Sequence, residues 1–81
     1  MYTAKELEAL LADAPDHAVV RVVSHGASTC FRKKGSQLTT TISTDWVQVR
    51  GHVGPTPKQL ELGAILLRVD RVDFIEVTVV P

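Results

Sequence analysis

A strict alternation of apolar and polar residues over 46–53 constrains the fold more than any other feature of the sequence. On one side of an extended chain the residues are apolar or small: Val47, Val49, Gly51 and Val53. On the other side they are polar or aromatic: Trp46, Gln48, Arg50 and His52. Successive side chains of a strand point to opposite faces of a sheet, so this pattern predicts a strand with one buried and one open face.

Four further segments are predicted to be strands from their β-branched content or their alternation: 18–24, 29–34, 38–44 and 72–80. Gly35 and Ser36 are expected to form the turn of a hairpin between the second and third of these segments. Asp45 is expected to break or bulge the chain before the strand over 46–53.

A helix is predicted over 3–14. Thr3 and Glu6 form a capping box, in which the hydroxyl accepts a hydrogen bond from the first turn and the carboxylate reaches back. Apolar residues then recur at helical spacing: Leu7, Leu10, Leu11 and Ala14. Pro15 ends the helix.

A second helix is predicted to begin after Thr56 and to end near 68–70. Thr56 is a good N-cap, Pro57 suits the first helical position, and Gln59 completes a second capping box. One face of this helix would carry Leu60, Gly63, Ala64 and Leu67. Gly63 is explained by close packing of the helix on a sheet.

This order of elements predicts an α+β fold in one domain, residues 1–81. Eighty-one residues are too few for a second independent core. We expect a two-layer sandwich, in which an N-terminal helix, an antiparallel sheet of four or five strands, a second helix and a C-terminal strand follow one another. Both helices would cover one face of the sheet and leave the other open.

The composition excludes several classes of protein. With 44% hydrophobic and 22% charged residues the chain is typical of a globular domain. A single cysteine cannot form an internal disulfide, which favours a reducing compartment, and we expect a cytoplasmic protein. No run of about 18 apolar residues is present, so no membrane span is expected.

Charge is unevenly distributed although the formal net charge is zero. Residues 17–58 contain six Lys or Arg and one acidic residue, Asp45, whereas the segments before and after them are acidic. The central strands are therefore expected to be basic. A polarised sheet of this kind indicates recognition of an acidic surface more than a catalytic cleft.

The open face of the strand over 46–53 is a candidate binding surface. It carries Trp46, Gln48, Arg50 and His52, which threonines from 39–41 and Glu76 and Thr78 of the last strand are expected to join. A tryptophan and an arginine on one flat face are typical of contact residues. The alternative interpretation is a solvated antiparallel face with Trp46 tucked under a loop.

The densest group of cations is Arg32, Lys33 and Lys34, directly before the expected turn. Three flexible cations on a protruding turn are able to grip phosphates or an acidic protein. The alternative is an ordinary solvated hairpin, since lysine also protects strand edges from aggregation.

Neither a catalytic set nor a metal site is predicted. Cys30 lies within a predicted strand, where a small buried thiol is the usual outcome. The spacing of Cys30 from His17, His25 and His52 does not match the paired ligands of a zinc site. We therefore expect no enzymatic activity, no cofactor and no metal.

The last strand is uncharged and strongly β-prone over 77–80. One interpretation is a central strand covered on both sides. The other is an edge strand that pairs with its two-fold mate and joins two copies in a homodimer.

The sequence thus predicts a small non-enzymatic protein-binding module, an adaptor or inhibitor of the kind that bacteria, phages and other mobile elements encode. Its partner would be a larger protein with an acidic surface. The contact residues are expected to be Arg21, Arg32, Lys33, Lys34, Trp46, Gln48, Arg50 and His52. The alternative function is nucleic-acid binding, with the same basic residues contacting phosphates.

Overall fold

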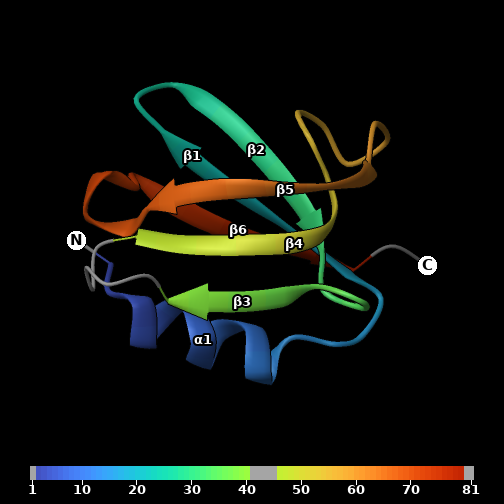
Figure 1. The fold of residues 1–81 in the computed structure, drawn as a ribbon, viewed down its shortest axis with the longest axis horizontal. Coiled ribbons are helices and arrows are strands. Elements are labelled where there is room, and N and C mark those ends of the chain that lie inside the picture. Colours follow the sequence, from blue (N-terminus) through green and yellow to red (C-terminus); the bar gives the residue numbers. More distant parts are fainter. Residues whose placement is uncertain (1, 41–45, 80–81) are drawn as a thin grey trace.

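The computed structural model describes residues 2–40 and 46–79, which form a small α+β fold (Figure 1). The described part of the chain contains one α-helix, one short 3₁₀ helix and six strands. In chain order they are α1 (Ala4–Asp13), β1 (Ala18–Ser24), β2 (Ala27–Arg32), β3 (Gln37–Thr40), β4 (Trp46–Gly54), β5 (Glu61–Arg68), η1 (Val69–Arg71) and β6 (Phe74–Val79).

The six strands form one antiparallel sheet, in which β4 pairs with three other strands. The order along the sheet is β3-β4-β2-β1-β6, and β5 pairs with β4 off this path. Residues 46–53 of β4 pair with β5, and β4 pairs with β3 and then β2 on the opposite edge. The sheet curls, so that β4 and β5 lie in front of β1 and β6 in Figure 1, and α1 runs beside β3.

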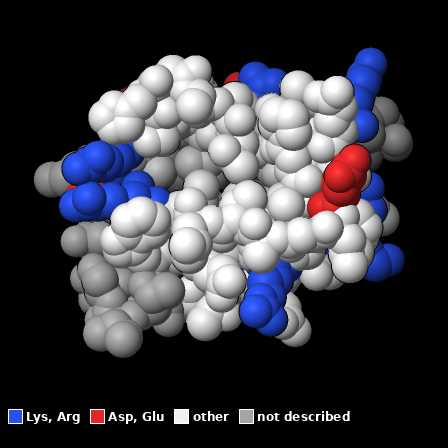
Figure 2. Space-filling model, turned by 45° about the horizontal axis from the view of Figure 1, so that its top comes forward, with Lys and Arg blue, Asp and Glu red and all other residues white. Residues whose placement is uncertain are grey.

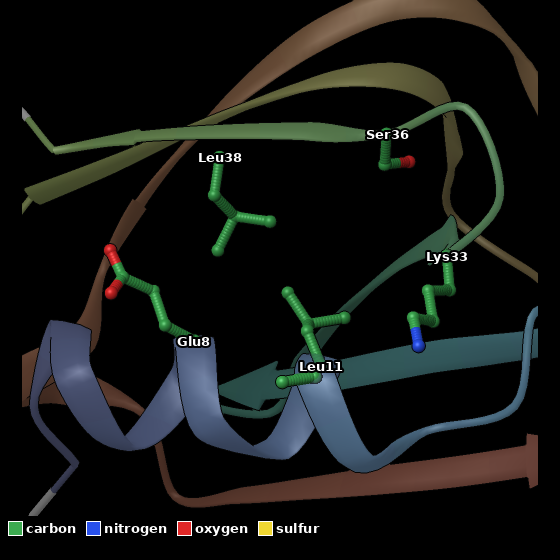
Figure 3. Close-up of a pocket in the computed structure, with 6 residues that line it drawn as sticks. Glu8, Leu11, Lys33, Ser36 and Leu38 are labelled. Carbon is green, nitrogen blue, oxygen red and sulfur yellow. The ribbon is translucent and has the colours of Figure 1, made fainter.

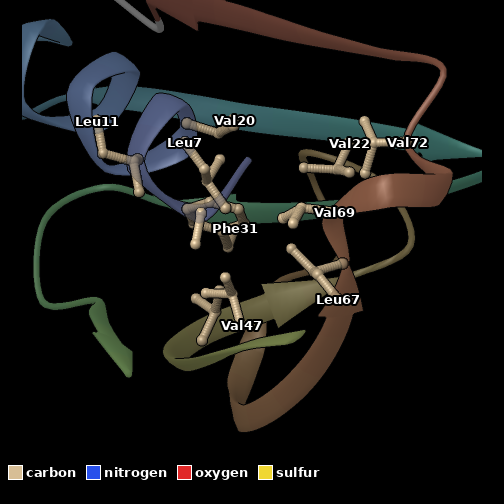
Figure 4. Close-up of a cluster of buried hydrophobic side chains, with 11 residues drawn as sticks. Leu7, Leu11, Val20, Val22, Phe31, Val47, Leu67, Val69 and Val72 are labelled. Atoms are coloured by element: carbon tan, nitrogen blue, oxygen red, sulfur yellow. The ribbon is translucent and has the colours of Figure 1, made fainter. Parts of the chain in front are cut away.

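The curled sheet and α1 enclose one hydrophobic core (Figure 4). Phe31 is completely buried near its centre. The other core residues come from the helix, three strands and the segment that follows β5: Ala4, Leu7, Leu11, Val20, Val22, Val47, Val49, Leu67, Val69 and Val72. The alternation predicted for 46–53 is confirmed over 46–50, where Val47 and Val49 are buried while Trp46 and Arg50 are exposed, whereas residues 51–53 are all partly buried.

The first helix is confirmed, with the cap that the sequence predicts. The Thr3 hydroxyl accepts a hydrogen bond from the Glu6 backbone N–H at 3.2 Å. Leu7 and Leu11 lie on the buried face. All five predicted strands have counterparts, although Asp45, with most of the predicted strand over 38–44, and Val80 fall outside the described residues. The predicted hairpin with its turn at Gly35 and Ser36 is wrong, because β2 pairs with β1 and β4 whereas β3 pairs with β4.

The predicted second helix is wrong, because residues 61–68 form β5. The capping-box residues do interact: the Gln59 N–H donates to the Thr56 carbonyl at 3.1 Å, and the Thr56 hydroxyl lies 3.2 Å from Gln59 Oε1. They close a single turn that does not continue. A short apolar run fits both periodicities, and here pairing of every β5 residue with β4 determines the structure. The two-layer arrangement with two helices on one face is therefore replaced by a curled sheet with one α-helix.

Two glycines of β4 allow close approach of backbone segments. A Cβ atom on Gly51 would lie 2.6 Å from Ser36 Oγ and 2.9 Å from Ser36 Cα. A Cβ atom on Gly54 would lie 1.7 Å from the Gln59 carbonyl oxygen. Gly51 thus admits the turn between β2 and β3, and Gly54 admits the segment that leads to β5.

Candidate functional site

The side chains of β3, β4 and β5 that point away from the core form one continuous surface, which we call the outer face. Strand register defines its members, because directly paired residues project to the same side. They are Gln37, Thr39, Trp46, Gln48, Arg50, His52, Leu62, Ala64, Leu66 and Arg68. All four predicted contact residues of β4 are therefore on this face.

The outer face is unusually apolar for a surface of a sheet that is open to water. Leu62 is 82% exposed, Leu66 is 59% exposed and Trp46 is 37% exposed. Figure 2 brings this side of the molecule forward and shows a broad uncharged area with both basic and acidic residues at its borders. Contiguous exposed apolar area of this kind marks an interaction site more often than a single exposed leucine does.

Two arginines border this apolar area. Arg50 is exposed and is paired in register with Gln37 and Ala64. Arg68 is opposite Trp46, with its Cζ atom 5.9 Å from the centroid of the indole ring. Its Nε atom also donates to Asp70 Oδ1 at 2.9 Å. The outer face itself carries cations and no carboxylate among the residues that define it.

A shallow depression of about 470 Å³ lies on the outer face. Its lining comes from β3, β4, β5 and the preceding turn: Gly35, Gln37, Arg50, Gly51, Leu62, Gly63 and Ala64. The paired glycines Gly51 and Gly63 contribute no side chains, so the depression is bounded by the Leu62 side chain and the Arg50 guanidinium. One apolar group and one carboxylate of a partner would fit this chemistry.

The other four predicted contact residues are on different parts of the fold. Arg21 and Arg32 lie on β1 and β2, and the register pairs Arg21 with Cys30 and Glu76. Because Cys30 is in turn paired with Gly54 of β4, Arg21 and Glu76 project to the same side of the sheet as His52, but on the part of the curled sheet that β1 and β6 form. Arg21 Nε is buried without a hydrogen-bond partner in the structure.

Lys33 and Lys34 differ in their surroundings although they are neighbours. The Lys33 ammonium donates a hydrogen bond to the Ala14 carbonyl at the end of α1, and the Lys33 N–H donates to the Ala18 carbonyl at 3.0 Å. Lys34 is exposed. Lys33 thus links the helix end to the sheet, which is a structural task that the sequence did not indicate.

A second hollow lies between α1 and β3 (Figure 3). Its lining residues include Glu8, Leu11, Lys33 and Leu38, and its volume is about 230 Å³. Small-molecule sites usually exceed roughly 300 Å³. The Lys33 ammonium that borders it is already engaged by Ala14, so this hollow is a weaker candidate than the outer face.

Cys30 is fully buried, as the sequence predicts. Its Sγ atom lies 3.9 Å from the Pro55 carbonyl oxygen and 4.0 Å from the Ser28 hydroxyl oxygen. Within residues 2–40 and 46–79, no cluster of three or more His, Cys, Asp or Glu side chains is placed to hold a metal ion. In the same ranges no helix has the length and apolar character needed to cross a membrane.

Comparison with known proteins gives no family for this chain: no protein-family model, no curated protein and no solved structure matches it.

Sequence reasoning missed the β5 half of the outer face, Leu62, Ala64, Leu66 and Arg68, because it placed these residues on a helix. A signal was present. From Leu62 to Arg68, every second residue faces outward; of the intervening residues Ile65 is partly buried and Leu67 is buried, whereas Gly63 is exposed. The alternation is hard to detect because both sides of the strand are apolar.

Proposed function

We propose that this protein is a small non-enzymatic binding module, an adaptor or inhibitor, that docks its outer face on a larger protein. The surface it recognises would offer apolar side chains flanked by carboxylates. The observation that carries this proposal is the exposure of Leu62 and Leu66 beside Trp46 on a single face.

The hydrophobic effect supports a docked state. Complete burial of a leucine side chain stabilises by roughly 1.5–3 kcal/mol relative to full exposure. Leu62 and Leu66 are separated by one outward-facing residue, Ala64, so one flat partner surface covers all three. Trp46 adds a large ring at the end of the same face, and tryptophan and arginine are the residue types most enriched among interface hot spots.

The charges support an acidic partner. Arg50 and Arg68 border the apolar area on the outer face. Carboxylates that meet these guanidinium groups would orient the partner and speed association. Arg68 is already held by Trp46 and paired with Asp70, so the exposed Arg50 is the stronger candidate to meet a partner's carboxylate.

Nucleic-acid binding is less favoured by the same surface. The Lys33 ammonium is engaged by the Ala14 carbonyl, which makes one of the predicted cations less available to phosphates. Exposed leucines on the outer face match neither phosphates nor a stacking platform, which requires several aromatic rings.

Affinity purification from host lysate tests the proposal, using the wild-type protein, Leu66→Glu and Arg50→Glu with and without nuclease. The captured protein is then purified and titrated directly against each variant. We expect Leu66→Glu and Arg50→Glu each to weaken binding at least about tenfold, because a charge replaces a buried leucine or opposes the partner's carboxylates.

Matched controls lie on α1. Leu10→Glu makes the same substitution at a leucine that is 38% exposed, and Lys5→Glu makes the same charge reversal as Arg50→Glu. Both should bind as the wild type does. Equal binding by all variants contradicts the proposal, and capture that nuclease abolishes shows nucleic acid to be the partner.

A further inference from the structure

The sheet ends in two strands that each have an unpaired edge. In the described part of the chain, β5 pairs only with β4, and β6 pairs only with β1. Although η1 and two more residues link them, they lie on opposite ends of the curled sheet, with β5 in front of β6 in Figure 1. β3 also borders the sheet, but it is short and α1 runs beside it.

Neither edge carries the usual protection against pairing. Proteins blunt edge strands with lysine, proline or bulges. Residues 62–67 of β5 are uncharged, and Glu76 is the one charged residue of β6. Strands of this composition with a free edge are templates for pairing with another chain.

The core is also incompletely covered at the β6 edge, where side chains that face inward are still exposed to solvent. Ile75, Val77 and Val79 project to the same side as the buried residues of β1, with which they are paired. Nevertheless Val77 is 38% exposed and Val79 is 54% exposed. On the β5 edge, Ile65 projects toward the core and is partly buried. Each edge therefore has apolar side chains that a further strand would cover.

We infer that β5 of one copy pairs antiparallel with β6 of a second copy, so that the protein assembles head to tail through its two free sheet edges. This inference does not depend on the proposed function, because the assembly uses the edge of β5 whereas the partner protein would cover its face.

Charge selects the antiparallel orientation. β5 carries Glu61 at its start and Arg68 at its end, and β6 follows Asp73 and contains Glu76. Antiparallel pairing brings Arg68 to the acidic end of the partner's β6, whereas parallel pairing would bring Glu61 there.

One register satisfies both charge and packing. With Arg68 opposite the partner subunit's Glu76, Leu67 is opposite the partner's Val77 and Ile65 is opposite the partner's Val79. These inward-facing pairs extend the core across the junction, and cross-strand apolar pairs of this kind stabilise a sheet. The same alternation places outward-facing residues opposite each other.

A second copy is the occupant because one chain carries both complementary edges. Two-fold pairing of β6 with β6 would leave the uncharged edge of β5 bare. Head-to-tail pairing in this register covers residues 65–68 of β5 and 76–79 of β6 at every junction. Since such an interface is heterologous, it repeats and gives a closed ring or an open chain of copies.

Sedimentation velocity and native mass spectrometry of the wild-type protein test the inference. We expect assemblies of three or more copies of the 8.8 kDa chain. Val79→Lys disables the β6 edge and Ile65→Lys disables the β5 edge, since lysine opposes edge pairing. Each variant alone should be monomeric, and an equal mixture should form a one-to-one dimer through the two intact edges.

Two-fold pairing makes the opposite prediction: Ile65→Lys would remain a dimer, Val79→Lys would be a monomer, and the mixture would form no new species. That pattern, or a wild-type monomer at high micromolar concentration, overturns the inference. Circular dichroism checks that both variants fold.

A charge swap provides an independent test if Ile65→Lys does not fold. Arg68→Glu and Glu76→Arg should each weaken assembly several-fold, and the double variant should restore it. Failure of the double variant to recover assembly contradicts the proposed register.

Discussion

Arg68 lies over the ring of Trp46, 5.9 Å from Cζ to the ring centroid, and its Nε atom is bound 2.9 Å away by Asp70. Trp46 and Arg68 are paired in register across β4 and β5. One strand pair therefore holds an aromatic and a cationic side chain together at the end of the outer face. The pair connects β4, whose outward-facing residues the sequence predicts, with β5, whose outward-facing residues it did not predict.

Arg68→Ala is expected to lower the free energy of unfolding by about 0.5–1 kcal/mol, because a partly exposed cation–π contact and a surface ion pair are each worth little. Urea unfolding followed by fluorescence measures this, since Trp46 is the only tryptophan of the chain. Arg50→Ala, at an exposed position of the same face, should change the stability less. A loss above about 2 kcal/mol would show that the Trp46–Arg68 pair is a main determinant of the fold.

Gly51→Ala is expected to destabilise the protein by about 1–3 kcal/mol, because the new methyl group overlaps backbone and side-chain atoms of Ser36. Gly63 is its direct partner on β5 and provides a matched control. A Cβ atom there would make an ordinary contact of 3.5 Å with Val53 Cγ2. Thermal unfolding should rank Gly63→Ala close to the wild type and Gly51→Ala clearly below it.

Lys33→Ala is expected to lower stability by about 1–2 kcal/mol, because the Ala14 carbonyl at the end of α1 loses a charged donor. Lys34→Ala, at the exposed neighbouring position, should change stability by less than about 0.5 kcal/mol. Chemical denaturation of both variants measures the difference. Equal losses of stability in the two variants would show that the total charge of the turn determines its contribution, and that the contact of Lys33 with α1 does not stabilise the fold.

The sequence predicted the elements whose local signals agree with their packing. The Thr3 cap and the leucine stripe give α1, and the alternation over 46–53 gives β4 because its buried and open faces differ in polarity. Val20 and Val22 are in the core, as strong β-branched patterning implies. Where propensity, periodicity and burial favour the same element, the local sequence pattern is sufficient to predict it.

The second helix failed because local and long-range interactions disagree. Thr56 and Gln59 start a turn, but the edge of β4 needs a partner over residues 46–53, and residues 61–68 supply it. Strand pairing over this distance leaves only a weak periodic pattern in the sequence when both sides of the strand are apolar. The exposure of Leu62 and Leu66 on the outer face was hidden for the same reason. The structural contact of Lys33 depends on the placement of α1 against the sheet, which no local pattern encodes.

Phe31→Ala is expected to destabilise the protein by about 3–5 kcal/mol, because it removes a completely buried ring from the centre of the core. A small domain has little stability to lose, so the variant should be largely unfolded at 37 °C. Phe74→Ala, at a ring that is 48% exposed, should retain the fold. Circular dichroism melting of both variants distinguishes them.

Cys30 should react slowly with a thiol reagent in the native state. Its side chain is fully buried on the side of β2 where Pro55 lies, so labelling requires local opening or unfolding. For a cooperative core strand we expect labelling at least about a hundredfold slower than in denaturant. Because the chain has one cysteine, the labelling rate reports on Cys30 alone, and the Cys30→Ser variant measures the non-specific background of the reagent. Rapid native labelling would show that the segment after Gly54 opens readily, and would return the thiol to consideration as a reactive group.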